Sequence, residues 1–382
     1  MSEGPSARGY FDWAATAPQD LLDLNAPFAN PSSRHREGRA AREALEGARE
    51  DCAAALGVPP ETIYFTSGGT ESNCIAIYSL LARQSGARML ASAGEHSSVR
   101  ENARNLERLG RKYGEIPLDG SGRVTPELLA RALEKYPDAR RIAIMAVNNE
   151  TGAISDTGAL RRALDSSGRP RAHLHCDAVQ ALGKIPVELQ LWGVDSASFS
   201  AHKIGGPRGI GILYLRKPID ALCLGGGQEK RVRAGTENVA GAMALARCMK
   251  ARAHPEALRA EGEKACARME RLLRGLEKTG RLSIIPASRA PEGGDGFSPY
   301  IVQVAFRDAP GEALARALDD MGYAVSTGAA CSSSSQDRPT LAAMGISEKQ
   351  MLEGIRVSQG WATTDAEIDG LIGATLEALK FL

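Results

Sequence analysis

The sequence predicts an α/β fold in which a mainly parallel sheet, covered by helices, is followed by a smaller α+β domain. The first observation is that short strand-like runs alternate with helical stretches between residues 63 and 215. Such alternation is typical of parallel sheets, because each crossover between parallel strands needs a helix. The second observation is a strand pattern followed by a helix pattern after residue 300. The third is the length of 382 residues, which suggests more than one domain.

The elements follow from local patterns taken in order along the chain. Small apolar residues recur at helical spacing from residue 34 to 56, and Gly57 ends this amphipathic helix. Runs rich in β-favouring residues then predict strands, and the amphipathic stretches between them predict helices. The predicted strands are 63–66, 88–92, 141–147, 172–176, 194–199 and 209–215, and the predicted helices are 72–83, 99–109, 126–136 and 155–165.

The remainder of the chain predicts the smaller domain. A helical region over 239–278 leads to a Pro/Gly-rich loop at 291–296, a strand at 300–306 and a helix at 311–321. We therefore expect three parts. They are an N-terminal segment (1–20) that packs on the small domain, a large cofactor-binding domain (21–250) and a small C-terminal domain (251–382).

Composition argues against several classes of partner. The 47 basic and 46 acidic residues give a net charge of +1, so the chain lacks the electrostatic footprint of a nucleic-acid-binding protein. No run approaches the roughly 18 apolar residues of a membrane helix, and the first residues do not resemble a targeting signal. Seven scattered cysteines indicate reduced thiols. We expect a soluble, cytoplasmic protein that binds neither nucleic acid nor membranes.

A lysine and an aspartate follow two of the predicted strands. Lys203 comes directly after a strand and before a glycine cluster, and a desolvated amine there can form a Schiff base with an aldehyde. A lysine considered alone is far more often a surface residue. Asp177 changes this balance, because it closes another strand. A carboxylate for a pyridinium nitrogen and a lysine for an aldehyde are what pyridoxal phosphate requires.

The segment 65–73 (FTSGGTESN) predicts a phosphate site. It follows a strand and opens a helix, so free backbone N–H groups near Gly69, together with the Thr70 hydroxyl, can cradle an anion. An ordinary capped glycine turn fits this motif equally well. Ser200 and His202, beside the lysine, could add phosphate donors. No glycine loop ends in Gly-Lys-Ser or Gly-Lys-Thr, so nucleotide hydrolysis is disfavoured.

Other polar residues follow neighbouring strands. His96 could stack on a cofactor ring and move protons, although a lone histidine is more often structural. Asn149 could bind a ring oxygen or a substrate carboxylate. His173 and His175 alternate along one strand but lack a third ligand at credible spacing, so packing is favoured over a metal site.

Two residues of the predicted small domain carry further chemistry. Cys331 lies among glycine, alanine and serine residues, in a segment that is too small and polar to pack tightly. It therefore differs from the cysteines in helical patterns, which read as inert buried thiols. Arg356, in a predicted strand at 354–358, could bind an α-carboxylate with two hydrogen bonds. A surface arginine is the commoner alternative.

Taken in order, these motifs closely resemble the cysteine desulfurases of the NifS and IscS type. These are aminotransferase class V enzymes of pyridoxal phosphate fold type I, whose large domain carries a mainly parallel seven-stranded sheet. The resemblance spans nearly the whole chain. The matching segments are 11–16, 30–35, 67–73, 95–96, 148–152, 177–180, 200–203, 225–229, 233–238 and the loop around Cys331.

The resemblance implies a role for each site residue. Lys203 would carry the cofactor and act as the base, His96 would stack on the ring and act as acid and base, and Cys331 would be the nucleophile. Cofactor contacts would come from Gly69, Thr70, Asn149, Asp177 at the pyridinium nitrogen, Gln180 at the ring hydroxyl, Ser200, His202 and, from the neighbouring subunit of a homodimer, Thr236. The substrate carboxylate would bind Arg356, Asn149 and Asn30.

The implied activity is conversion of L-cysteine to L-alanine, with the sulfur held on Cys331 as a persulfide. An acceptor protein of iron–sulfur cluster assembly or tRNA thiolation would take it. The context of Cys331 resembles the long-loop group of the family, whereas Trp13, Ala17, Gln359 and Trp361 depart from the usual pattern. A selenocysteine lyase, another pyridoxal phosphate lyase or aminotransferase, and a binding protein without turnover remain as alternatives.

Overall fold

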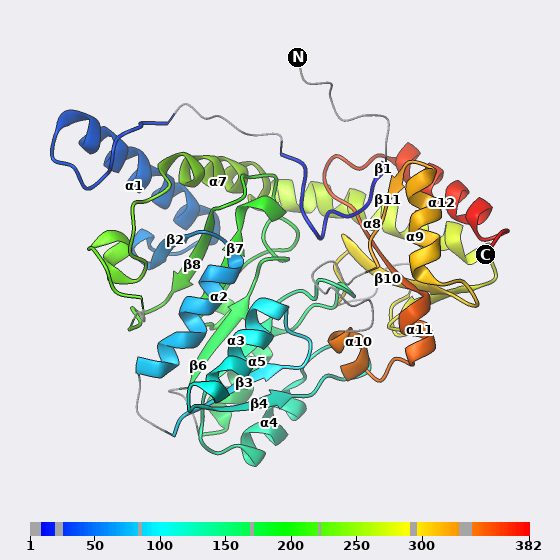
Figure 1. Ribbon diagram of the computed structural model, residues 1–382, viewed down its shortest axis with the longest axis horizontal. Coiled ribbons are helices and arrows are strands. Elements are labelled where there is room, and N and C mark those ends of the chain that lie inside the picture. The colour runs from blue at the N-terminus through cyan, green and yellow to red at the C-terminus, as the bar shows by residue number, and fades with distance from the viewer. Residues whose placement is uncertain are drawn as a thin grey trace.

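The structure is a computed structural model that describes residues 9–19, 26–82, 86–168, 172–220, 223–290, 296–327 and 338–382. The largest sheet in this part of the chain has seven strands in the order β2-β8-β7-β6-β5-β3-β4 (Figure 1). β8 runs antiparallel to both of its neighbours, and the other neighbouring strands are parallel. The predicted mainly parallel sheet is confirmed. Its strands are β2 (Ile63–Thr66), β3 (Arg88–Ser92), β4 (Lys112–Ile116), β5 (Ala139–Met145), β6 (His173–Asp177), β7 (Ser196–Ser200) and β8 (Gly211–Leu215).

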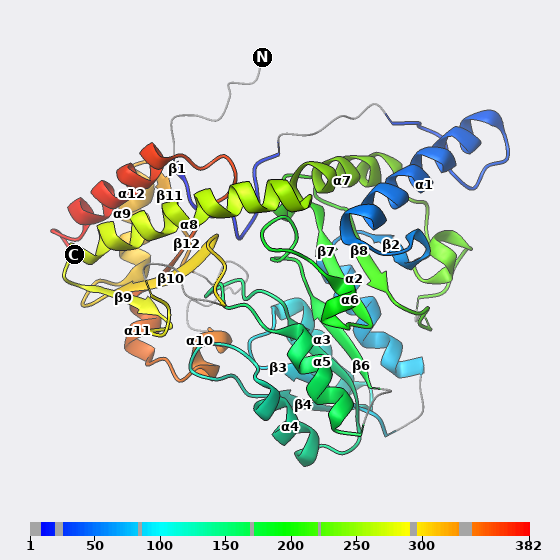
Figure 2. The same ribbon diagram turned by 180° about the vertical axis from the view of Figure 1, so that it is seen from behind.

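Helices cover both faces of this sheet, which Figures 1 and 2 show from opposite sides. Met89 and Ala91 of β3 pack against α2 and α3, whereas Leu90 points into the larger core on the other face. This alternation follows from the two-residue period of a strand. The helices are α1 (Arg36–Leu56), α2 (Gly69–Tyr78), α3 (Ser97–Arg108), α4 (Pro126–Lys135), α5 (Thr157–Ser166), α6 (Leu189–Trp192) and α7 (Val239–Arg252).

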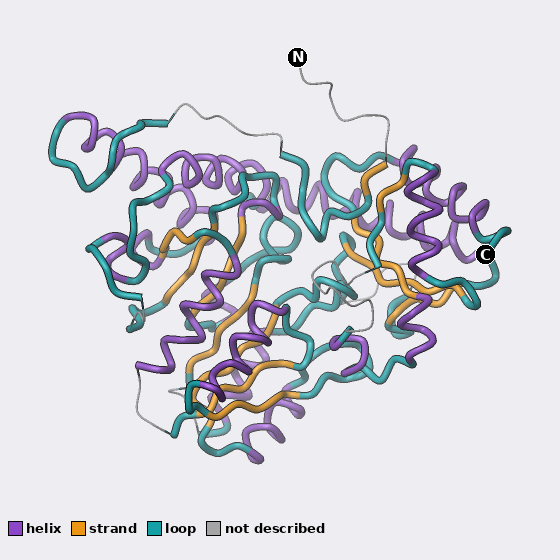
Figure 3. Tube along the Cα trace, viewed as in Figure 1, coloured by secondary structure: helices purple, strands orange, loops and turns teal. Residues whose placement is uncertain are grey.

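A second, smaller group of helices and strands lies beside the large sheet (Figure 3) and has its own apolar core. The antiparallel sheet β12-β10-β9 packs with helices on a cluster that includes Leu273, Val304 and Ile355. The long helix α8 runs from the large sheet to this group (Figure 2). Its elements are α8 (Pro255–Glu277), β9 (Leu282–Ile285), β10 (Ile301–Phe306), α9 (Gly311–Asp320), α10 (Pro339–Ala343), α11 (Glu348–Glu353), β12 (Gly354–Ser358) and α12 (Asp365–Ala378).

The beginning of the described chain lies against this smaller group. β1 (Gly9–Tyr10) pairs in parallel with β11 (Tyr323–Ala324), and Phe11 is part of the smaller core. The residues that follow, Ala14 and Ala15, turn back toward the large sheet and line a cavity at its edge. The N-terminal segment therefore touches both parts of the molecule.

Several predicted elements match the structure and some do not. The strands 63–66, 88–92 and 354–358 have the predicted bounds. The helical region 239–278 is two helices, because Pro255 cannot continue α7 and instead opens α8. β4 and α12 were not predicted. In the described ranges, no helix has the length and apolar content needed to cross a membrane.

Candidate active site

A cavity of about 490 Å³ lies at the edge where β3, β5, β6 and β7 end. Because these strands are parallel, their carboxyl ends meet at one edge, which is where α/β sheets bind ligands. Ten of the predicted site residues line this cavity. They are Gly69, Thr70, His96, Asn149, Asp177, Gln180, Ser200, His202, Lys203 and Arg356.

One side of the cavity is the start of α2. The first-turn N–H groups of a helix have no partner within the helix and favour an anion. A Cβ on Gly69 would lie 2.6 Å from Cγ2 of Val179, so any other residue here would have to displace that side chain. The imidazole of His202 lines the same cavity and interacts through Nδ1 with the Thr16 hydroxyl at 3.2 Å. Burial, with the nearby charge of Lys203, lowers the pKa of His202 to about 4, so its ring is neutral at neutral pH.

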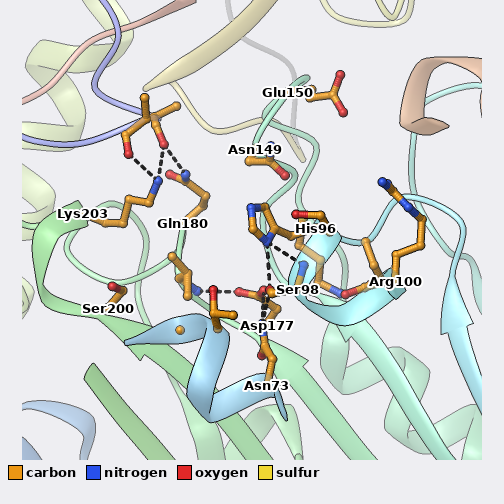
Figure 4. Close-up of a pocket in the computed structure, with 18 of the residues that line it drawn as sticks. Asn73, His96, Ser98, Arg100, Asn149, Glu150, Asp177, Gln180, Ser200 and Lys203 are labelled. Carbon is orange, nitrogen blue, oxygen red and sulfur yellow. Dashed lines mark hydrogen bonds between the residues drawn. The ribbon is translucent and has the colours of Figure 1, made fainter. Parts of the chain in front are cut away.

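Lys203 lies opposite, directly after β7 (Figure 4). Its Nζ donates to the carbonyl oxygens of Ala14 at 2.6 Å and Ala15 at 2.8 Å. Nε2 of Gln180 donates to the same Ala14 oxygen at 2.8 Å. The amide oxygen of Gln180 accepts from Nζ of Lys184. The Ala14 oxygen can only accept, so it fixes the orientation of the Gln180 amide, and the bond from Lys184 agrees with that orientation.

Asp177 ends β6, and its carboxylate is held by two donors. Oδ2 accepts from Nδ2 of Asn73 at 2.8 Å, and Oδ1 accepts from the backbone N–H of Val179 at 3.1 Å (Figure 4). The residue is 4 % exposed. A buried, oriented carboxylate is suited to pair with a protonated ring nitrogen.

The proton of His96 has a defined position. Its Nδ1 accepts from the backbone N–H of Ser98 at 3.1 Å and lies 2.8 Å from the Ser98 hydroxyl. Burial lowers the pKa of the His96 imidazole. A neutral ring whose Nδ1 accepts carries its proton on Nε2. His96 can therefore donate from Nε2.

Two buried carboxyl groups also line the cavity, Glu95 and Glu150. Burial raises the pKa of Glu95 to about 8, and burial also raises the pKa of Glu150. Oε1 of Glu95 accepts from the Ser92 hydroxyl at 2.5 Å and from the Met145 N–H at 2.7 Å. At neutral pH Glu95 is therefore mostly protonated and adds little negative charge beside Asp177.

Arg356 reaches the cavity from β12 and is 3 % exposed. Its Nη1 donates to the backbone oxygen of Asn149 at 3.0 Å, and its Nη2 donates to Oδ1 of Asp12 at 2.7 Å. Arg100 of α3 also lines the cavity. The site thus presents guanidinium groups to a substrate carboxylate.

Two predicted residues lie elsewhere, and the position of a third is not described. Asn30 and Thr236 are exposed and do not line this cavity, and the role predicted for Thr236 is in the neighbouring subunit. Cys331 lies outside the described residues. Sequence reasoning missed Asn73 as a site residue, although its place three and four residues after Thr70 and Gly69 puts it on the same face of α2.

The arrangement fits pyridoxal phosphate. The open start of α2 beside Gly69 and Ser200 matches a phosphate, and the buried Asp177 carboxylate matches a ring nitrogen. Lys203 presents a primary amine to the same cavity, and an amine can form a Schiff base with an aldehyde. The volume is within the range of small-molecule sites, which is roughly 300–1,000 Å³.

Comparisons with known proteins agree with this geometry. The model of the family "Aminotransferase class-V" matches residues 9–371. The cysteine desulfurase IscS of Dictyoglomus turgidum is 38 % identical over 94 % of this chain and 91 % of its own length. A solved NifS-like protein superimposes with a TM-score of 0.88 at 34 % identity, over 98 % of this chain and 100 % of its own. The structure of SspA in complex with cysteine superimposes with a TM-score of 0.76 at 27 % identity, over 92 % and 98 % of the two chains. The chain therefore belongs to the aminotransferase class-V family, among the pyridoxal phosphate-dependent cysteine desulfurases of the IscS and NifS type.

Proposed function

We propose that this cavity converts L-cysteine to L-alanine and passes the sulfur to Cys331, from which an acceptor protein takes it. The observation that carries the proposal is the meeting of Lys203, Asp177 and Arg356 in one cavity. They supply an amine for an aldehyde, a carboxylate for a ring nitrogen and a guanidinium for an α-carboxylate. The cysteine bound in the SspA structure supports L-cysteine as the substrate.

Pyridoxal phosphate would be held by the start of α2, Thr70, Ser200 and His202 at the phosphate, and by Asp177, Gln180 and Asn149 around the ring. When bound, the cofactor supplies an electron sink for the charge that develops at Cα of the substrate. Arg356, with Asn149 and Asn30, would bind the substrate carboxylate. These contacts place Cα within reach of the Lys203 amine.

The remaining steps fall to residues of the chain. Lys203 takes the proton from Cα through Nζ, and His96 holds a donatable proton on Nε2. The Cys331 thiolate attacks the substrate sulfur, so that an S–S bond forms and the C–S bond breaks. The electron pair of the broken C–S bond stays on the carbon skeleton, and Cβ takes up a proton to become a methyl group. A proton returns from Lys203 to Cα, which gives L-alanine. Cys331 is oxidised to a persulfide, and the carbon skeleton is reduced.

We also propose how the chains assemble and where the sulfur is used. A homodimer is proposed in which Thr236 reaches the phosphate of the neighbouring subunit, which accords with its exposure outside this chain's own cavity. The sulfur would serve iron–sulfur cluster assembly or tRNA thiolation in the cytoplasm. The division into 1–20, 21–250 and 251–382 is supported by the two separate apolar cores and by the β1–β11 pairing.

The test compares wild type with Cys331→Ala, and uses Cys266→Ala as the matched control because Cys266 is an exposed cysteine on α8. Alanine and sulfide are measured from L-cysteine with a reductant, and the absorbance of bound cofactor is recorded. We expect equal yields of alanine and sulfide from wild type and control, and bound cofactor without turnover in Cys331→Ala. Without reductant, a peptide containing Cys331 should gain the mass of one sulfur atom.

Other results would favour the alternatives. Full activity in Cys331→Ala would indicate a lyase that needs no sulfur-carrying cysteine. Bound cofactor without turnover in wild type would indicate a binding protein. Turnover of selenocysteine but not of cysteine would indicate a selenocysteine lyase.

A further inference from the structure

A strip of polar side chains lies under α2, on one face of β6 and β7. His173, His175 and Asp177 alternate along β6, and the Ser196 hydroxyl of β7 lies 2.7 Å from a ring nitrogen of each histidine. The intervening residues Leu174 and Cys176 belong to the apolar core on the other face. Polar groups in the middle of a sheet are costly unless they are hydrogen-bonded. Each polar group of the strip therefore needs a hydrogen-bond partner.

The direction of each hydrogen bond in the strip can be assigned. Nε2 of His175 lies 2.9 Å from Oδ1 of Asn73, and an amide oxygen only accepts, so His175 carries its proton on Nε2. Burial, with the charge of Arg141, lowers the pKa of His175 to about 3, so the ring stays neutral. Its Nδ1 must then accept from the Ser196 hydroxyl. The Ser196 oxygen in turn accepts from Nε2 of His173.

Asn73 uses all of its polar groups in one orientation. Its Oδ1 accepts from His175, and its Nδ2 donates to Oδ2 of Asp177 at 2.8 Å and to the Ser98 oxygen at 2.9 Å (Figure 4). A flipped amide would place its oxygen against the Asp177 carboxylate and its N–H groups against the N–H of His175. The Asp177 carboxylate therefore selects this orientation, and the Nε2–H of His175 bonds to the amide oxygen on the opposite side.

The bond to Ser98 extends the chain to His96. Because the Ser98 oxygen accepts from Asn73, its hydroxyl proton is free to point at Nδ1 of His96, 2.8 Å away. Nδ1 is thus occupied by donors, and the proton of His96 stays on Nε2. The side chain of Asn73, which is 1 % exposed, thus connects the Asp177 carboxylate with the His96 imidazole through Ser98.

We infer that Asn73, held in one orientation by His175, is a positioning residue that aims the Asp177 carboxylate at the ring nitrogen of pyridoxal phosphate and keeps the His96 proton on Nε2. The inference rests on the cofactor site of the proposed function, and it does not depend on turnover of cysteine. His175, which the sequence predicts to be a packing residue, acts through Asn73.

The experiment measures binding of two compounds to cofactor-free protein. One is pyridoxal phosphate, and the other is its 1-deaza analogue, which has a C–H group in place of the ring nitrogen and the same shape. Wild type should prefer pyridoxal phosphate, because Asp177 pairs with the ring nitrogen. In Asn73→Leu, which keeps the volume and loses the amide, this preference should fall about tenfold, the value of roughly one hydrogen bond to a charged group.

Variants of His175 test whether this residue holds Asn73 in its orientation. His175→Leu should lower the preference in the same direction, because nothing then holds Oδ1 of Asn73. His175→Gln should retain most of the preference, since its amide can still donate to Asn73. If Asn73→Leu does not fold, this pair carries the same test.

The control is Asn105→Leu, the same substitution at an amide of α3 that donates to the Tyr78 hydroxyl at 2.8 Å. It should leave the preference unchanged. Equal weakening of both compounds in Asn73→Leu and His175→Leu, with the preference intact, would overturn the inference and show a merely structural role. Asp177→Asn gives the lowest preference for pyridoxal phosphate over the analogue that is expected of any variant. If that variant keeps the wild-type preference, Asp177 does not pair with the ring nitrogen, and both the proposed cofactor site and the inference fail. A protein that binds the cofactor but has no desulfurase activity would contradict the proposed function and not the inference.

Discussion

The guanidinium of Arg356 donates from Nη2 to Oδ1 of Asp12 at 2.7 Å, which joins β12 to the N-terminal segment. Nη1 donates to the backbone oxygen of Asn149 at 3.0 Å, so the guanidinium is held from two sides. The side chain of Asp12 is 22 % exposed and that of Arg356 is 3 % exposed. A substrate carboxylate would therefore approach an arginine whose charge is already partly neutralised.

Asp12→Asn tests this arrangement. The asparagine oxygen can still accept from Arg356, so the guanidinium keeps its place while the competing negative charge is removed. We expect the KM for L-cysteine to fall about fivefold, which corresponds to roughly 1 kcal/mol of charge interaction in a partly hydrated site. Steady-state kinetics at fixed ionic strength measure this. Asp369→Asn, which removes a surface partner of Arg271, should leave KM unchanged, and a higher KM in Asp12→Asn would contradict the expectation.

A second prediction concerns the buried ion pair between Arg49 and Glu229. Two guanidinium nitrogens donate to the carboxylate, both at 2.8 Å, and the backbone N–H of Phe65 adds a third bond at 2.8 Å. Glu229 also begins a left-handed turn, with φ of 42° at Glu229, 52° at Lys230 and 68° at Arg231. Such conformations are unfavourable for residues with a Cβ and need support from their surroundings.

Glu229→Gln should therefore destabilise the protein by about 3 kcal/mol, because the buried charge of Arg49 would keep only its half-exposed carboxylate partner, Glu46. Urea unfolding of the cofactor-loaded protein measures the change. Glu312→Gln breaks an exposed pair with Arg316 and should cost less than about 1 kcal/mol. An equally small effect at Glu229 would mean that water or another group takes over the charge of Arg49.

More of the cavity lining than of the edges of the fold could be predicted from the sequence. Lys203 and Asp177 could be placed at this edge because Asp177 ends one strand, and Lys203 follows another, whose alternating residues are visible in the sequence. β4 (KYGEI) was missed because it is an edge strand, paired only with β3 in the described sheet, and it carries exposed charges and a glycine. α12 has two glycines that lower its helix propensity, and packing of Leu371 in the smaller core offsets them.

The chain of polar residues behind Asp177 could not be predicted from spacing. It depends on the register of β6 with β7, which pairs His175 with Ser196, and on the position of α2 across both strands. Neither is encoded in a local pattern, because residues 73, 175 and 196 come from three different elements. The sequence alone therefore favours a packing role for His175, because its partner on α2, Asn73, is far away along the chain.

A third prediction uses Lys184, whose side chain is buried against Gln180. Burial, with the charges of Lys203 and Arg356, lowers the pKa of Lys184 from 10.5 to about 7. Between pH 7 and 10.5 the unfolded chain binds this proton and the folded protein does not, so this group makes stability rise with pH. Below pH 7 both states are protonated, and the cost of burying the charge is fully present.

Lys184→Met removes this dependence. The free energy of unfolding of wild type relative to the variant should rise between pH 7 and 10, by at least about 1 kcal/mol, the value of one pKa unit. Denaturant unfolding at pH 6, 8 and 10 measures it. Lys250→Met, at an exposed position on α7, is the control, and its free energy of unfolding should change with pH as that of wild type does. If Lys184→Met also follows wild type at all three pH values, the buried amine has an ordinary pKa.

The last prediction uses Glu95, whose carboxyl group is buried beside Asp177 and whose pKa is raised by burial from 4.5 to about 8. Between pH 4.5 and 8 the folded protein binds this proton and the unfolded chain does not, so this group makes stability fall as the pH rises through that window. Glu95→Gln keeps an oxygen that can accept from Ser92 and Met145, and its amide cannot ionise. The variant should therefore gain stability relative to wild type from pH 4.5 to 8, by at least about 1 kcal/mol, and the gain should level off above pH 8.

Unfolding midpoints at pH 5, 7 and 8.5 measure this gain, with Glu101→Gln on the exposed side of α3 as the matched control. The control should change stability by the same amount at each pH. If Glu95→Gln also shows a constant difference, Glu95 ionises in its ordinary range in the folded protein. Glu95 and Asp177 would then place two negative charges side by side in the cavity. Asp177 would no longer be the main negative charge at the ring nitrogen, and the conclusion that Glu95 is neutral would be wrong.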